Sequence, residues 1–172
     1  MSQPLTITFL GTGTSGGVPM IGCDCEVCCS VDKKDKRLRS SILVRSAKTT
    51  IVVDSGPDFR YQMLRERVRE LDAIVYTHSH KDHVAGLDDV RAYNFFSGRA
   101  MQVYSDEMTQ QVLLREFPYA FQDQRFPGVP EIQLNSIDLD PFTIGDIPVI
   151  PIQVWHLRMP VLGYRFGNFT YI

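Results

Sequence analysis

The sequence lacks several features that would place it in a large class of proteins. No apolar run reaches the roughly 18 residues that cross a membrane, and no basic region followed by an apolar signal core stands at the start. Basic residues do not exceed acidic ones, and the formal net charge of -2 argues against a globally basic nucleic-acid-binding protein. We therefore expect a cytoplasmic protein that has no membrane contact and for which nucleic acid is a disfavoured partner.

Low-complexity segments and internal repeats are also lacking, and the 172 residues include 44% hydrophobic residues. This length and composition suit one globular domain covering residues 1–172. The segment KKDKRLR at 33–39 is the one marked basic cluster. We interpret it as a solvated loop in preference to a patch that contacts phosphates.

Cysteine is absent except from one stretch of seven residues, which holds Cys23, Cys25, Cys28 and Cys29. Such spacing in a cytosolic protein favours metal binding over a disulfide framework. The pattern C-x-C-x-x-C predicts that Cys23, Cys25 and Cys28 bind a structural zinc, with Cys29 spared because adjacent side chains diverge. Four unpaired reduced thiols are the alternative.

A glycine pattern precedes these cysteines. Gly11, Gly13 and Gly16 spell G-x-G-x-x-G directly after an apolar strand-like run, as in dinucleotide-binding proteins. That interpretation requires a helix to follow at once, but Pro19 and further glycines prevent one, and the nearest suitably spaced acid, Asp32, lies in a charge run. We expect the glycines to serve backbone geometry instead.

Strands and helices alternate along the chain. Extended segments are predicted at 5–11, 40–46, 49–56, 72–78, 100–105, 131–137, 142–156, 161–167 and 168–172. Three helices are predicted: one from about Asp58 with Phe59, Met63, Leu64, Val68 and Leu71 on one stripe, one after His83 with Val84, Leu87 and Val90, and one capped by Ser105 with Met108, Val112 and Phe117. The segment 117–130 is predicted to be a long ordered loop, which either covers a site or packs against the core.

The strongest signal is THSHKDH, where a predicted strand ends and a helix begins. It contains His78, His80, Asp82 and His83, so three of the four histidines of the protein lie within six residues. Residues two apart in an extended loop point to the same side, so His78 and His80 can hold one ion, while Asp82 and His83 can face a second. Imidazole and carboxylate are ligands for zinc, manganese or iron.

The H-x-H-x-D-H pattern, the segment IVVDSGPD and the opening GTGTSGGVP…CDCEVC together resemble the metallo-β-lactamase-fold hydrolases. The cysteine cluster and VWHLRMPVLGYRFG resemble the branch that contains the phosphonate-pathway cyclic phosphodiesterases and, more distantly, tRNase Z. The resemblance implies an αββα sandwich with a two-metal site at one edge. It implies that His78, His80 and His156 bind the first metal and that Asp82 and His83 bind the second.

The resemblance also implies roles around the metals. Asp54 matches an acid that supports the metal-binding loop by hydrogen bonding, although an ordinary turn-forming aspartate is the alternative. The glycine loop is placed near the rim of the active site. The implied enzyme is a metallo-hydrolase that cleaves a small phosphodiester, including a cyclic one, with a hydroxide activated by two zinc or manganese ions. Asp82 would bind one metal and orient the water.

The sequence departs from the family pattern at its end. The family supplies a metal-bridging aspartate after a strand such as FTYI and a later histidine, but Ile172 is the last residue, and a final histidine for the cysteine-bound zinc is also missing. We therefore expect a domain without its C-terminal part, with an apolar edge strand that favours homo-oligomers. The alternatives are a tRNA 3′-processing-type nuclease and a metal-binding scaffold without catalysis.

Overall fold

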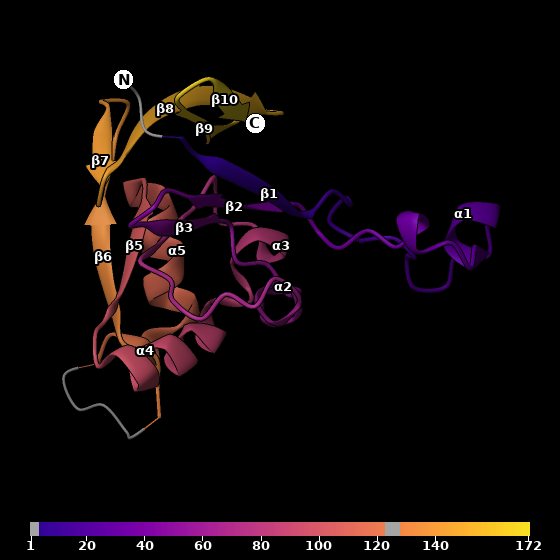
Figure 1. Cartoon of the computed structure of the whole chain (residues 1–172), viewed down its shortest axis with the longest axis horizontal. Helices are drawn as coiled ribbons and strands as arrows, with labels where there is room; N and C mark the ends of the chain where they lie inside the picture. Colours follow the sequence, from indigo (N-terminus) through magenta and orange to yellow (C-terminus); the bar gives the residue numbers. More distant parts are fainter. Residues whose placement is uncertain (1–3, 123–127) are drawn as a thin grey trace.

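Two β-sheets form the framework of the computed structural model, which describes residues 4–122 and 128–172 (Figure 1). The first sheet has six strands in sequence order: β1 (Thr6–Gly11), β2 (Ser41–Arg45), β3 (Thr50–Val53), β4 (Ala73–Val75), β5 (Met101–Ser105) and β6 (Ile132–Ser136). The second sheet has four strands in the order β10 (Phe169–Tyr171), β9 (Met159–Phe166), β8 (Ile147–His156) and β7 (Phe142–Ile144). Each segment predicted to be extended contains a strand, but the single segment predicted at 142–156 is wrong in one respect: it divides at Gly145, which has a positive φ of 57°, into β7 and β8, which pair antiparallel.

The pairing pattern of the first sheet positions the functional loops. The strands β1, β2 and β3 pair antiparallel, whereas β3 to β6 pair parallel and need crossover connections. Because parallel strands end at the same edge, the segments that follow β3 and β4 emerge side by side. These segments are the loop that starts at Asp54 and the loop that carries His78 to His83.

Helices in the crossovers cover one face of this sheet. They are α2 (Phe59–Arg65), α3 (Lys81–Val84), α4 (Arg91–Ser97) and α5 (Glu107–Glu116), with 3₁₀ turns η2 (Leu87–Val90) and η3 (Pro118–Ala120). Side chains such as Phe59, Leu87 and Leu113 pack with Val52 and Ile74 in one buried cluster. Burying this apolar face is the main stabilising contribution of the layer.

Several details of the predicted helices are wrong. The first helix ends at Arg65, because Arg67 adopts a positive φ of 52°, and Leu64 is 60% exposed instead of lying on the buried stripe. The cap of α5 is Asp106, whose carboxylate accepts a hydrogen bond from Thr109 N at 2.8 Å, while Ser105 is buried at the end of β5. A side-chain hydrogen bond therefore moves this helix start by one residue.

The buried face of α5 also differs from the predicted one. Met108 is 47% exposed, whereas Thr109 and Leu113 face the core. The second predicted helix exists as three shorter pieces, α3, η2 and α4. The residues Val84, Leu87 and Val90 are all fully buried, so the predicted apolar face is confirmed even though the helix is divided.

The second sheet packs on the other face of the first. Its inward side chains, including Ile147, Leu162 and Tyr164, join Ile42 and Val53 in a second buried cluster. Along β8 the first residues alternate between buried and exposed, so one face of the strand is covered and the other is open. The described residues therefore form three layers, α/β/β, of the αββα arrangement that the resemblance implies.

A segment that contains α1 (Glu26–Cys29) and the 3₁₀ turn η1 (Lys33–Asp35) extends away from these layers (Figure 1). We call residues 12–40 the arm. Its base is closed by a backbone bridge from Gly13 to Arg39 and by an ion pair between Arg39 and Asp58, 3.1 Å apart. A Cβ atom on Gly11 or Gly13 would overlap the backbone oxygens of residues 37–39, so these glycines serve close backbone approach, as predicted.

Two further predictions concern loops and membranes. In the segment 117–130, Phe117 and Ala120 are buried in the helix-side core and Phe121 packs against it, which supports packing as the role of this part. Residues 123–127 of that segment lie outside the described residues. None of the helices in the described part of the chain has the length and apolar character needed to cross a membrane.

Candidate metal centre

Four histidines from both sheets meet at one edge of the molecule. His78 and His80 follow β4, His80 precedes α3 as its N-cap residue, and His156 is the last residue of β8. One ring nitrogen from each of these three residues lies within 4.8 Å of the other two. His83, in α3, packs against His78 with ring centroids 4.0 Å apart and the ring planes tilted by 47°.

The hydrogen bonds of His78 indicate which of its ring nitrogens is free. The Thr77 hydroxyl lies 2.9 Å from Asp54 Oδ2, and because a carboxylate only accepts, the hydroxyl donates to it. Thr77 Oγ1 can then accept from His78 Nδ1, which lies 3.0 Å away. This assignment leaves His78 Nε2 without a proton, so its lone pair is available to bind an ion. His78 Nε2 lies 3.1 Å from His80 Nδ1.

Asp54 organises the base of this cluster. It is fully buried directly after β3 and adopts a positive φ of 64°. Its carboxylate accepts hydrogen bonds from the backbone N–H of Thr77 at 2.9 Å and from His83 Nδ1 at 2.8 Å. A buried carboxylate with several donors fixes the orientation of the rings around it, as carboxylates beside metal-binding histidines do.

Asp82 and His83 form a second pair of donors. Because His83 Nδ1 faces Asp54, its Nε2 is directed elsewhere, 3.3 Å from Asp82 Oδ2. In the described part of the chain no third histidine, cysteine or acid brings a donor atom within the same spacing of this pair. The histidine centre therefore offers one set of three imidazoles and, beside it, one set of two donors.

The electrostatics suit cation binding. Burial, then the neighbouring His83 and His80, lowers the pKa of His78 to about 3, so this imidazole is neutral and available as a ligand at neutral pH. Burial acts to lower the pKa of His83 as well, but the hydrogen bond and charge of Asp54 and the charge of Asp82 raise it above its ordinary value. The neutral imidazole of His78 and the carboxylate of Asp82 are donor types that zinc and manganese accept.

Two glycines allow the loops to pack this closely. A Cβ atom on Gly56 would overlap the backbone oxygen of Asp82, and one on Gly86 would overlap the backbone oxygen of Gly56. The loop after β3 thus rests directly on the backbone that carries Asp82 and His83. A side chain at either position would push the metal-binding loop outward.

Comparison with known families adds to this geometry. Residues 49–172, well over half of the chain, match the family model described as "Beta-lactamase superfamily domain". The chain belongs to the metallo-β-lactamase superfamily. A solved structure titled as a new diphosphatase from the PhnP family superposes with a TM-score of 0.89 and 40% sequence identity, covering 98% of this chain and 65% of that one.

Two relatives match this chain over nearly its whole length. An octanoyltransferase from Porphyromonas gingivalis is 40% identical over 95% of this chain, and a Ribonuclease Z from Methanopyrus kandleri is 32% identical over 96% of it. The chain spans 33% of the first relative and 51% of the second. A zinc-bound PqqB from Methylobacterium extorquens shares the fold, with a TM-score of 0.68 at 20% identity.

This member of the metallo-β-lactamase superfamily has a second cluster of donor atoms, on the arm. The Sγ atoms of Cys23, Cys25 and Cys28 lie within 4.8 Å of one another, while Cys29 is exposed and outside this group. A backbone hydrogen bond from Cys28, followed by side-chain hydrogen bonds from Cys23 and Cys28, lowers the pKa of Cys25 to about 7. The arrangement supplies three sulfur donors of the kind that structural zinc uses.

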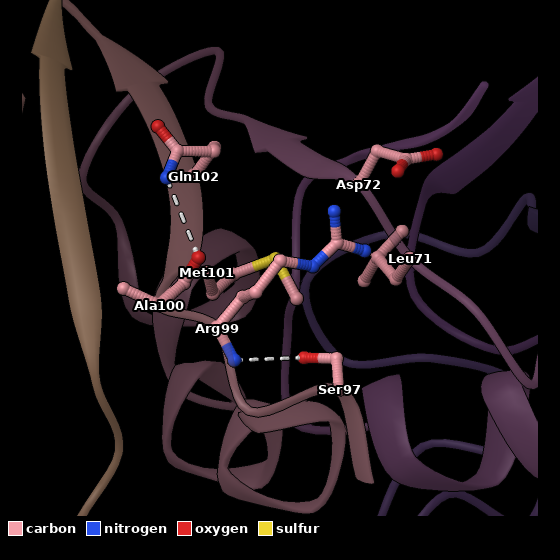
Figure 2. A pocket seen from close by; sticks show the side chains of 7 residues that line it. All are labelled: Leu71, Asp72, Ser97, Arg99, Ala100, Met101 and Gln102. Atoms are coloured by element: carbon pink, nitrogen blue, oxygen red, sulfur yellow. Dashed lines mark hydrogen bonds between the residues drawn. The ribbon is translucent and has the colours of Figure 1, made fainter. Parts of the chain in front are cut away.

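A cavity of about 140 Å³ lies at the opposite end of the parallel strands (Figure 2). Its lining includes Asp72 and Arg99, next to the first residues of β4 and β5. Several of its polar groups bond within the protein, since Asp72 Oδ2 accepts from Thr50 N at 2.8 Å and Ser97 Oγ accepts from Arg99 N at 3.2 Å. These bonds serve the fold, and the histidine centre remains the candidate functional site.

Sequence reasoning missed the residues that support this centre from behind. Thr77, Gly56 and Tyr164 all contact the backbone or side chains of the histidine loop, yet none belongs to a metal-binding pattern. The position of Thr77, directly before the first histidine, was the one available signal. The part played by Gly56 and Tyr164 depends on contacts distant in sequence.

Proposed function

We propose that this chain is a metal-dependent hydrolase of phosphate ester bonds, with a small phosphodiester, including a cyclic one, as its substrate. The convergence of His78, His80 and His156, with Asp82 and His83 beside them, carries the proposal. The 40% identity with a structure titled as a diphosphatase supports a phosphorus centre as the target. The octanoyltransferase from Porphyromonas gingivalis, also 40% identical, would point to acyl transfer, but this chain spans 33% of that relative against 65% of the diphosphatase structure.

Each donor set has a role in this proposal. His78, His80 and His156 hold the first divalent ion, zinc or manganese, and Asp82 with His83 holds the second. Divalent ions in such centres lower the pKa of a bound water and polarise the phosphoryl oxygen. Because the second set offers two donors among the described residues, we expect the second ion to bind more weakly than the first.

The residues of the chain prepare the site for that chemistry. Asp54 holds His83 through its Nδ1 and Thr77 through its backbone N–H, so the rings need little reorganisation when an ion binds. The carboxylate of Asp82 lies beside His83 Nε2, where it can accept a hydrogen bond from the attacking water and orient it. This assigns Asp82 both ligation and positioning of the nucleophile.

A tRNA-processing nuclease is the second candidate. The 32% identity with a Ribonuclease Z over 96% of the chain favours it, as does the basic segment 33–39 on the arm. Two of these basic residues already have partners within the protein: Lys36 Nζ donates to Cys28 O at 3.0 Å, and Arg39 pairs with Asp58. The hydrogen bond to a neutral carbonyl group leaves the charge of Lys36 in place, so the segment keeps most of its positive charge; the net charge of -2 for the whole sequence is what favours a small substrate.

The test uses the full chain loaded with manganese or zinc. We expect slow hydrolysis of bis-p-nitrophenyl phosphate, because the second donor set holds its ion weakly. His80→Ala should lose this activity and most of the ion bound at the histidine centre, because a ring nitrogen of the three-imidazole set is removed. Ser79→Ala, between two of the ligands, is the matched control and should keep both. An unstructured single-stranded RNA and a precursor tRNA serve as competing substrates.

The outcomes separate the candidates. Faster cleavage of precursor tRNA than of the small diester and of the single-stranded RNA would favour the nuclease. Tight metal binding without hydrolysis of any probe would instead favour a metal-binding scaffold without catalysis. Activity that survives both chelation and His80→Ala would overturn the metal-dependent mechanism.

A further inference from the structure

The three-imidazole set draws its members from two different sheets. His78 and His80 follow β4 of the six-stranded sheet, while His156 ends β8 of the four-stranded sheet. The buried cluster between the sheets is apolar, and apolar packing has no directional preference that would fix one sheet along the other. A directional contact between the sheets near the site would therefore add to the packing in setting the spacing of the histidines.

Two hydrogen bonds supply such a contact. The Tyr164 hydroxyl donates to Tyr76 O at 2.6 Å, and Leu162 N donates to Thr77 O at 2.9 Å. Both acceptors lie within two residues of His78. Both donors lie on β9, the strand that forms a hairpin with β8 and pairs Met159 with His156.

We propose that Tyr164 is a positioning residue that sets the distance between His156 and the His78–His80 pair by holding β9 against the end of β4. The proposal rests on the proposed function, because it concerns the same metal centre. Tyr164 is fully buried, and its side chain spans from the second sheet to the carbonyl group of Tyr76. Tyr76 is fixed in turn, since its hydroxyl lies 2.5 Å from Ser55 Oγ beside Asp54.

The chain offers a matched pair of substitutions. Tyr164→Phe removes one hydroxyl that donates to a backbone carbonyl group. Tyr93→Phe removes another, which donates to Val68 O at 3.0 Å from the helix layer. Each variant keeps its aromatic ring, so both should fold, and near-UV circular dichroism and melting temperature check this for each.

Metal affinity is the first measurement, made by zinc titration of the wild type and of both variants against a chromophoric chelator. Tyr164→Phe should weaken the first ion by about tenfold, as loss of groups that orient ligands commonly does. Tyr93→Phe should leave the affinity unchanged. Equal affinity in the wild type and Tyr164→Phe, or an equal loss in both variants, would overturn the proposal.

A second measurement needs no metal. In the metal-free protein the rings of His78 and His156 have centroids 5.8 Å apart, and nuclear Overhauser effects between their protons report this proximity. The effects should weaken in Tyr164→Phe and persist in Tyr93→Phe. If the effects are lost in Tyr164→Phe but the wild type binds no ion, the positioning role is retained and the proposed function is refuted. Persistent effects in Tyr164→Phe, beside normal metal binding, would refute the positioning role alone.

If Tyr164→Phe does not fold, the wild type still tests the proposal. Since linkage is reciprocal, an ion that binds better when the sheets are held in register must also strengthen that register. Zinc should therefore slow hydrogen exchange of the Leu162 amide. An exchange rate that zinc binding leaves unchanged would contradict the proposal.

Discussion

The histidine centre and the cysteine cluster look alike as sets of donor atoms but differ in what surrounds them. In each, three donor atoms lie within 4.8 Å of one another. The histidines stand on two packed sheets, above a fully buried carboxylate, Asp54. The cysteines stand on the arm, where α1 has no buried residue and the backbone bonds near them are local, such as Cys29 N to Cys25 O at 3.0 Å.

This difference predicts two relations between metal and structure. A centre fixed by core packing and buried hydrogen bonds exists before an ion arrives, so metal removal should leave its fold intact. A centre fixed by local contacts alone obtains much of its order from the ion, so that binding and folding are coupled. The predictions below test this contrast, starting with the largest expected effect.

Replacing Asp54 should have the largest effect. Asp54→Asn keeps the size of the side chain and tolerates the positive φ, but it places an amide donor against groups that donate to the carboxylate. We expect the affinity of the histidine centre for zinc to fall by about 10- to 100-fold. A competition titration with a chromophoric chelator measures this.

Asp58→Asn is the matched control for Asp54→Asn. It lies in the same loop but pairs with Arg39 at the base of the arm, so it should leave the histidine centre unchanged. Unchanged zinc affinity in Asp54→Asn would show that the buried carboxylate does not prepare the ligands. The contrast between a preformed and an ion-ordered centre would then lose its main support.

A methyl group added behind the histidine loop should have the next largest effect. The Cβ of Gly56→Ala would overlap Asp82 O, and because backbone on both sides is packed, relief requires the loop to move. We expect a loss of about 1–3 kcal/mol in the free energy of unfolding, as for other overpacked sites. Denaturant unfolding of the metal-free protein measures it.

The equivalent change on the arm is the control. The Cβ of Gly16→Ala would meet the flexible side chain of Met20 at 3.3 Å, so the expected loss is below about 0.5 kcal/mol. Similar losses for Gly56→Ala and Gly16→Ala would indicate that the histidine loop is no more tightly packed than the arm.

These contacts explain how far the sequence could lead. The strands and the histidine motif were predictable, because alternating apolar residues and ligand spacing are local patterns. The capping error at Ser105 arose from a choice between neighbouring residues that both suit a helix start. Gly56 and Tyr164 could not be assigned a role, because each acts on a backbone group that lies 26 and 88 positions away, respectively. The ligand and zinc assignments themselves stay predictions.

Acid should destabilise the metal-free histidine centre. The pKa of His78 is lowered to about 3 from 6.5, so between these values the unfolded chain binds a proton that the folded chain does not. The contribution of His78 to the free energy of unfolding is therefore fully present above pH 6.5 and is lost as the pH falls toward 3. The raised pKa of His83 acts in the opposite direction, with stability lost as the pH rises through its folded value.

The melting temperature of the metal-free wild type should accordingly fall between pH 6.5 and pH 5 more steeply than that of His78→Asn. Arg39→Lys, at the base of the arm, serves as the control and should keep the wild-type slope. Parallel curves for the wild type and His78→Asn would show that His78 is not held neutral by the folded structure.

The smallest global effect is expected on the arm, where Cys25→Ser removes one of three clustered thiols. Because α1 buries no side chain and the arm stands away from the layers, the melting temperature of the body should change little, as for surface substitutions of about 0.5 kcal/mol or less. Local order should change instead. In the wild type, zinc should slow proteolysis within residues 12–40, and Cys25→Ser should lose that protection, while Cys29→Ser, outside the cluster, should keep it.

If Cys25→Ser binds as much zinc as the wild type and is equally protected, the three thiols do not act together. If the substitution instead lowers the melting temperature of the whole protein as much as Gly56→Ala does, the arm is part of the same cooperative unit as the histidine centre, and the proposed contrast between the two regions is wrong.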